Sequence, residues 1–322
     1  MHYQRNDAIG AGTGVPALAW LKAAGGQPHL LAGPQGDVLW KPSIDRWSFG
    51  LGMLIGTMEG GVIMNLDGTL LLELPGPRVL IMMNARILMP PPSLGEVGMK
   101  GGVLAVIEVT PEHFMVGVLI SWEVEKLIKI VIPVEAVFPF PPNLHKWHVY
   151  LGARKDIGQS IEVDVLGIVR GTGYLMFKGD GLQKFKTTGG ELSEIQGMAI
   201  GVGVAASFTW GSTSAGLYLR VGGGMDAVVG FDPVIVHGTV YVAGELRLFI
   251  VSIGAYASLE VKVNEQEKLP NQESGSLQLY VHGKACGKVS FLFFDVEGCV
   301  DITIAGPKKS SPMPQLVEKV SL

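Results

Sequence analysis

The residues able to do chemistry are few and scattered. His145 and His148 flank a tryptophan, and on a helix this spacing would bring two imidazoles to one side of a turn. A proline-rich segment precedes them and an apolar run follows, so we expect a loop leading into a strand, where positions i and i+3 point to opposite faces. That geometry is poor for shared metal coordination. The sequence therefore predicts no metal site.

The two cysteines, Cys286 and Cys299, lie near each other in the chain. They form a disulfide if neighbouring strands bring their Cα atoms within about 7 Å, or they remain as unreactive thiols. Both alternatives are open. A thiol nucleophile is disfavoured, because His282 precedes Cys286 by four residues but nothing nearby would orient its imidazole.

Motifs for other chemistry are missing. The glycine-rich residues 10–14 depart from G-x-G-x-x-G and follow no strand, and no phosphate loop, nucleophile elbow or zinc helix occurs. Asp180, Asp226 and Asp232 stand beside glycine or proline, so they are predicted as turn residues and not as calcium ligands. We therefore expect no enzyme, no catalytic residue and no cofactor.

Composition excludes several classes of protein. The 25 basic and 29 acidic residues are interspersed and give a net charge of −4, so nucleic acid is not an expected partner. Only 17% of residues are charged and 48% are hydrophobic, which excludes general disorder. Residues 1–10 carry charges where a secretory signal needs an apolar core, so no export signal is expected and the compartment stays open.

A transmembrane helix is not expected either. The longest uncharged stretch, residues 195–219, contains five glycines and a polar centre. This pattern favours two strands joined by a turn over a spanning helix.

Helical patterns are scarce. A short helix is predicted over residues 15–24, closed by Gly25 and Gly26, and a helical turn over residues 191–196. Two hairpins are predicted in the N-terminal half. One lies within residues 62–72, with Asp67-Gly68 as its turn, and the other joins residues 103–109 to residues 114–124.

Strict alternation marks the C-terminal half. In four segments between residues 239 and 304, apolar side chains occupy every second position. With a period of two they line one side of an antiparallel sheet, and that side must face a second layer or an apolar ligand. The candidate ligand-binding residues on this face are Val240, Val242, Leu246, Leu248, Ile250, Leu259, Val261, Leu277, Leu279, Val300 and Ile302.

The expected fold is mostly β: an extended or curled antiparallel sheet built from repeated hairpins, with few short helices. Residues 244–253 and 287–296 echo each other and favour such repeated hairpins. Two proline clusters, at residues 89–93 and 138–143, and a charged segment at 178–194 suggest boundaries. The predicted parts are residues 1–46 (N-terminal segment with the short helix), 47–140 and 141–186 (two β units), 187–304 (C-terminal antiparallel β unit) and 305–322 (tail or linker).

Four strings carry a resemblance: residues 147–152 (WHVYLG), 173–177 (GYLMF), 218–222 (YLRVG) and 287–299 (GKVSFLFFDVEGC). With them the chain resembles segments of very large, uncharacterised bacterial β-repeat proteins, over roughly residues 47–304. The resemblance implies a fold and no catalytic residue. A weaker architectural analogy links the chain to groove-forming β proteins that transfer lipids.

The sequence thus favours a β scaffold whose apolar groove binds lipid or another apolar partner. Exposing several hundred Å² of apolar surface would forgo many kcal/mol at about 25 cal/mol per Å², so something must cover the face. The alternative is a structural or assembly subunit of a larger bacterial or phage particle or secretion machine, in which neighbouring subunits cover it. An outer-membrane barrel is disfavoured because residues 79–83 and 127–134 are nearly continuous apolar runs.

Overall fold

The structure is a computed structural model, and it is almost entirely β. The residues that it describes are 2–11, 15–28, 30–56, 64–87, 101–124, 127–265, 277–291, 294–306 and 317–320. The first proline cluster, part of the glycine run at 10–14 and most of the expected tail lie outside these residues. The chain divides into two compact units, Met1–Val163 and Asp164–Leu322. The finer division into five parts remains a prediction.

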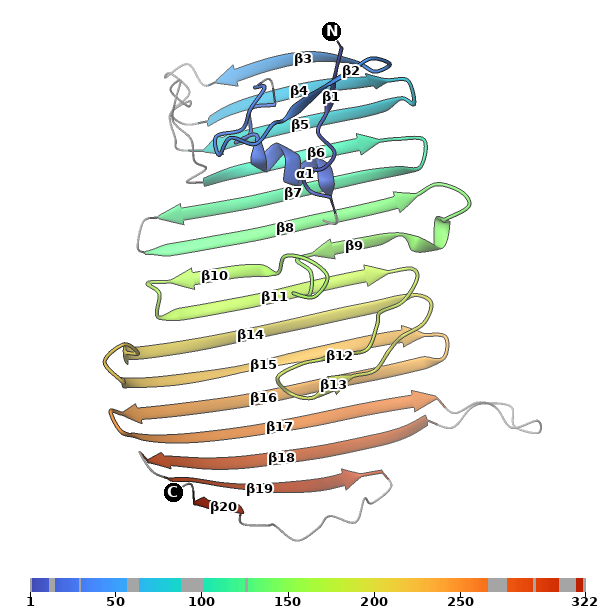
Figure 1. Ribbon diagram of the computed structural model, residues 1–322. Helices are drawn as coiled ribbons and strands as arrows, with labels where there is room; N and C mark the ends of the chain where they lie inside the picture. The colour runs from blue at the N-terminus through green and yellow to red at the C-terminus, as the bar shows by residue number, and fades with distance from the viewer. Residues whose placement is uncertain are drawn as a thin grey trace, which may run out of the picture. The chain divides into compact units, whose positions relative to one another are not determined.

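The first unit is an antiparallel sheet in the order β3-β4-β5-β6-β7-β8-β9, with a separate β1-β2 pair (Figure 1). Its strands follow one another along the chain, as expected for repeated hairpins. The elements are β1 (His2–Arg5), α1 (Pro16–Ala23), β2 (Trp40–Ser43), β3 (Trp47–Gly56), β4 (Met64–Leu74), β5 (Arg78–Ile87), β6 (Gly101–Val109), β7 (His113–Val124), β8 (Ile128–Pro139), the 3-10 turn η1 (Leu144–Lys146) and β9 (His148–Leu151).

The second unit is an antiparallel sheet in the order β11-β14-β15-β16-β17-β18-β19-β20, and β12 pairs with β13 in a small hairpin. β10 (Ile161–Val165) runs across the boundary of the two units. The elements are β11 (Val169–Lys178), β12 (Phe185–Lys186), β13 (Glu191–Leu192), β14 (Ala199–Ser212), β15 (Leu217–Phe231), β16 (Val234–Leu248), β17 (Val251–Glu265), β18 (Leu277–Phe291), β19 (Phe294–Ala305) and β20 (Val317–Val320).

The predicted short helix forms as α1. Pro16 opens it, at a position where the missing N–H costs nothing, and Gly25 and Gly26 close it with φ values of 63° and 74°. Their N–H groups donate to the carbonyl oxygens of Lys22 and Leu21. None of the described helices is long and apolar enough to cross a membrane.

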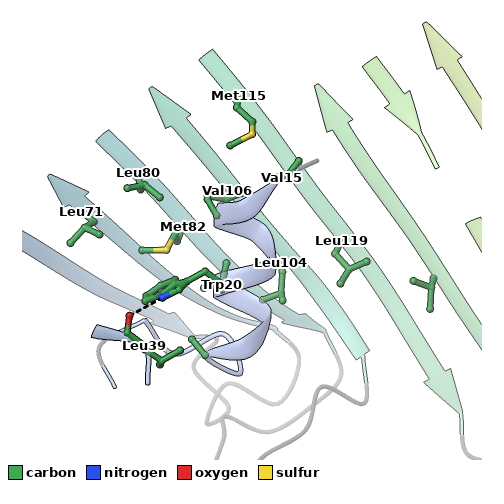
Figure 2. Packing of buried hydrophobic residues seen from close by; sticks show 14 residues of the cluster. Val15, Trp20, Leu39, Leu71, Leu80, Met82, Leu104, Val106, Met115 and Leu119 are labelled. Carbon is green, nitrogen blue, oxygen red and sulfur yellow. Dashed lines mark hydrogen bonds between the residues drawn. The ribbon is translucent and has the colours of Figure 1, made fainter. Parts of the chain in front are cut away.

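The core of the first unit lies between α1 and one face of its sheet (Figure 2). Trp20 of α1 is fully buried, and its indole N–H donates to the Leu39 carbonyl oxygen at 3.0 Å. Beneath the helix lie Leu71, Leu80, Met82, Leu104, Val106, Met115 and Leu119.

The sheet confirms one predicted hairpin and corrects the other. β6 and β7 meet across residues 110–112, as expected. Asp67 and Gly68, however, lie in the middle of β4, with β3 on one side and β5 on the other. Ladder bonding to two neighbours outweighs the local turn preference of an Asp-Gly pair.

Two further predictions are wrong for the same kind of reason. Residues 191–196 form no helical turn: β13 occupies 191–192, and Ile195 bridges back to Leu182. Asp226 is no turn residue but lies within β15, where its carboxylate accepts a hydrogen bond from the Tyr174 hydroxyl at 2.8 Å. The glycines near it, such as Gly224, leave room for the ring of Tyr241, which a Cβ would approach to 2.9 Å.

Candidate ligand-binding face

Strand register shows which side chains share a face, because directly paired residues of antiparallel strands project to the same side. In the second unit the pairs follow one another across the sheet. One row runs Val204, Met225, Val240, Leu259, Gly283 and Ile302. A second row runs Trp210, Leu219, Leu246, Ile253, Val289 and Val296.

These rows belong to a continuous surface that we call the second unit's apolar face. It consists of every second residue in seven strand segments, namely the residues that project to the same side of the sheet as these two rows. On that face every residue is apolar or glycine within 169–177, 200–210, 217–231, 234–248, 251–263, 279–291 and 294–302.

No described part of the chain shields this face. Side chains on it are widely exposed: Val240 49% and Val242 57% near its centre, and Ile302 56% on β19. A side chain within a two-layer protein would be almost fully buried. The sheet therefore presents a broad hydrocarbon surface.

The first unit repeats the arrangement. One row of its sheet runs Leu51, Leu70, Ile81, Ile107, Val116 and Ala136, and the described residues in step with it on β3–β9 are again all apolar or glycine. We call this the first unit's apolar face. It is opposite the face that α1 covers, since Leu71, Leu80 and Val106 alternate with these residues.

The sequence-predicted residues gather on the second unit's apolar face, with one exception. Ile250 lies in the turn between β16 and β17, because β16 ends at Leu248. Leu277 is placed by register alone, opposite Glu265. The others lie on the face: Val240, Val242, Leu246 and Leu248 on β16, Leu259 and Val261 on β17, Leu279 on β18, and Val300 and Ile302 on β19.

Sequence reasoning missed the corresponding face of the first unit. There the helix-facing positions are also apolar, so the strands read as continuous apolar runs without alternation. The signal that could have separated the faces lies in a few polar residues, such as Asn84 and Glu108, which occupy only the helix side.

Buried charges also mark the helix side of the first unit. The Arg5 and Arg78 guanidinium groups each lie 3.2 Å from Glu108, and Arg78 lies 3.1 Å from Glu73. Burial of Arg78 would lower its pKa, but the carboxylates of Asp7, Glu108 and Glu73 raise it above the ordinary value. The Arg5–Glu108 pair attaches the N-terminal strand β1 to the sheet, and the Arg78 pairs join β5 to β4 and β6.

The opposite face of the second unit, which we call the polar face, carries its polar side chains together with buried apolar residues such as Met176 and Val228. The β12-β13 hairpin lies on this face and contacts it through His237. The Nδ1 atom of His237 accepts hydrogen bonds from the Ser193 N–H at 3.0 Å and the Ser193 hydroxyl at 2.9 Å, which leaves the proton on Nε2. Nε2 donates to Glu260 at 2.9 Å. Burial lowers the pKa of His237, although Glu260 acts in the opposite direction.

Serine, imidazole and carboxylate here follow the order used in nucleophilic hydrolysis. The backbone N–H of Ser193, however, shares the single lone pair of Nδ1 with its own hydroxyl. The group therefore anchors the hairpin to the sheet. No sequence spacing predicted it, because Ser193 follows β13 while His237 and Glu260 lie on β16 and β17.

The two cysteines form the disulfide that the sequence left open. Cys286 on β18 and Cys299 on β19 are directly paired, with Cα atoms 4.1 Å apart. The bond lies on the polar face, since its neighbours Ala285 and Val300 are on the apolar one.

The helix side of the first unit also holds a cavity of about 610 Å³, lined by Tyr3, Trp40, Gly50, Gly52 and Leu71 among others. The two glycines of β3 leave it open. It lies on the opposite side of the sheet from the first unit's apolar face.

Comparisons with known proteins give no family. No family model matches the chain, and no curated protein matches it. Among solved structures the chain is similar to a loop L8 deletion mutant of OmpT, an outer membrane protein of Vibrio cholerae, at 10% identity and a TM-score of 0.30. The match covers 81% of this chain and 92% of that one.

The structural match corrects one expectation. The missing motifs led to the prediction that the chain is not an enzyme, and the match is the finding against that prediction. The prediction is withdrawn. A TM-score of 0.30 assigns no activity in its place.

Proposed function

We propose that the chain is a β scaffold whose apolar faces bind the acyl chains of lipids. The observation that carries the proposal is the second unit's apolar face, which has no polar side chain within its bounds and no cover from the described residues. The largest apolar patch on a typical monomer is only a few hundred Å². A face this large needs an occupant.

The chemistry of the face favours hydrocarbon as that occupant. Protein interfaces carry about one hydrogen bond per 100–200 Å² and a polar rim. Apart from the indole N–H of Trp210, the rows of this face offer only side chains such as Val240, Leu259 and Ile302, which neither donate nor accept. Acyl chains need no hydrogen bonds, so they lose nothing when they lie on it.

The length of the strands also suits lipid. β16 has 15 residues, which span roughly 50 Å at about 3.3 Å per residue. The hydrocarbon core of a bilayer is about 30 Å thick. An acyl chain from one leaflet, about half that thickness, fits on the face with room to spare.

Lipid extraction from the purified chain, followed by mass spectrometry, tests the proposal directly. We expect co-purified lipid, and we expect a fluorescent fatty acid to bind. The substitution Leu259→Asp puts a charge at the centre of the face, where Leu259 is 39% exposed. A charge held against hydrocarbon costs about 3 kcal/mol, so affinity should fall roughly 100-fold.

The matched control is Ser258→Asp. Ser258 is the neighbouring residue on β17, but it projects to the polar face and is paired with Lys284. The Ser258→Asp variant should bind the fatty acid with the same affinity as the unmodified chain. Equal affinity for both variants, or a chain free of lipid that associates through this face with a second copy, would refute the proposal and favour an assembly role.

A further inference from the structure

Two of the turns at one end of the second unit are apolar, whereas the β14-β15 turn at the same end contains Thr213 and Ser214. Leu166, Gly167 and Ile168 join β10 to β11, and Phe249 and Ile250 join β16 to β17. The side chains of Leu166, Phe249 and Ile250 are 55%, 63% and 59% exposed. At the other end of the sheet, Asp232 and Pro233 form an ordinary polar turn.

Register places the apolar turns at the same end. Val169, just after the first turn, pairs with Phe208 near the end of β14, and Leu217 pairs with Leu248, just before the second. Trp210, 67% exposed, lies between them on β14. Figure 1 shows these hairpin ends on the left side of the second unit.

The backbone of these turns is strained. Leu166 and Phe249 have φ values of 57° and 53° and are the only non-glycine residues with positive φ in the described part of the chain. Side chains are sterically disfavoured there, and hairpin turns normally use Gly, Asn or Asp. At this end of the second unit's sheet, the chain thus has both backbone strain and water-exposed apolar side chains.

Positive charge lies beside these turns. Arg220 and Arg247 are exposed near the ends of β15 and β16 and form no salt bridge with a described residue, whereas Arg170 at the same end is paired with Asp164 at 3.1 Å. Arg220 lies 5.4 Å from the ring of Tyr218, and Glu245, paired with Arg220, accepts the Tyr218 hydroxyl. Guanidinium groups bind phosphate oxygens well. Apolar and tryptophan side chains flanked by arginine are typical of groups that enter a membrane interface.

From this combination we infer that this end inserts into the interface of a phospholipid bilayer. The membrane-docking end comprises Leu166, Trp210, Phe249 and Ile250, with Arg220 and Arg247 positioned for headgroup phosphates. The inference rests on the proposed function, because a face that carries acyl chains needs a place to exchange them. Leu217 and Leu248 connect the membrane-docking end with the apolar face, since both lie on that face and beside the turns.

Co-sedimentation with vesicles of equimolar phosphatidylcholine and phosphatidylglycerol tests the inference. The variant Leu166→Asn, Phe249→Gly, Ile250→Asn removes the apolar turn residues. It also supplies Asn-Gly and Gly-Asn turns, whose residues suit the positive φ, so folding should be retained. We expect the variant to lose vesicle affinity at least about tenfold, since several apolar side chains no longer leave water.

The matched control is Met198→Asn. Met198 is 49% exposed and precedes β14 at the other end of the sheet, so vesicle affinity should not change. Vesicles of phosphatidylcholine alone should bind the unmodified chain more weakly, because the arginines then meet no net negative charge. Equal sedimentation of the triple variant and the unmodified chain, or no sedimentation of either, overturns the inference.

Lipid content separates this failure from a failure of the proposed function. A triple variant that no longer sediments but still carries co-purified lipid supports both proposals. A chain that sediments through these turns yet binds no fatty acid overturns the proposed function alone. A chain that binds fatty acid but sediments identically with and without the apolar turns overturns the membrane-docking end alone.

Discussion

Arg78 shows how a single residue attaches the N-terminal segment to the first unit's sheet, because its guanidinium group lies 3.0 Å from Asp7 and also contacts Glu73 and Glu108. The Glu73 and Glu108 side chains that it contacts are only 7% and 4% exposed. Arg78→Met keeps much of the volume but leaves two buried carboxylates with fewer partners. Removing one partner of a buried ion pair costs about 3–5 kcal/mol, so the free energy of unfolding, measured with urea, should fall by an amount near the lower end of that range.

The control for this prediction is Arg170→Met. Arg170 also contacts a carboxylate, Asp164 at 3.1 Å, but its side chain is 68% exposed. Exposed ion pairs contribute about 0–1 kcal/mol. Similar losses in the two variants would show that burial of the Arg78 cluster does not matter.

At the scale of elements, the β12-β13 hairpin depends on a neutral imidazole. Nδ1 of His237 can accept from Ser193 only while it carries no proton. Burial lowers the pKa of His237 in the folded chain, so the unfolded or detached state binds the proton more readily. The anchoring is therefore complete above the ordinary histidine pKa of about 6.5 and weakens as the pH falls below it.

Hydrogen exchange of residues 182–195 measures this effect. After correction for intrinsic rates, protection should fall roughly fivefold between about pH 7 and pH 5, equivalent to a hydrogen bond of about 1 kcal/mol. His237→Asn keeps an acceptor near the Nδ1 position but does not titrate, so its protection should be lower overall yet independent of pH. The same pH dependence in both proteins would assign the effect to a group other than His237.

The sequence predicted those elements whose signals are local. The helix α1 begins at a proline and ends at two glycines, and the β6-β7 hairpin separates two alternating runs. Asp67-Gly68 misled because local turn chemistry was overruled by pairing with β3 and β5. Ser193 contacts His237, 44 residues away, and Asp226 contacts Tyr174, 52 residues away, and no local pattern carries that information.

The candidate ligand-binding face, like the fold, was predictable from the sequence only in part. Alternation placed Val240, Leu259 and Ile302 on one face of the second unit, since period two fixes the side of a sheet. It did not show that the face would lack a covering layer. In the first unit it did not separate the faces, because α1 also needs apolar partners such as Leu80 and Val106.

At the scale of the whole molecule, an uncovered apolar face makes solubility depend on its occupant. If acyl chains cover the apolar faces, removing them returns residues such as Val242 and Ile302, both more than half exposed, to water. At about 25 cal/mol per Å², even 400 Å² of such surface corresponds to about 10 kcal/mol, enough to drive association between copies. We therefore expect protein stripped of lipid by a hydrophobic resin to form dimers or larger species in light scattering after gel filtration. Added fatty acid should return it to the original size, and the Leu259→Asp variant, whose face carries a charge, should associate less when stripped. A stripped chain that stays monomeric at every concentration would mean that its own residues cover the face in solution, and the lipid-binding proposal would lose its physical basis.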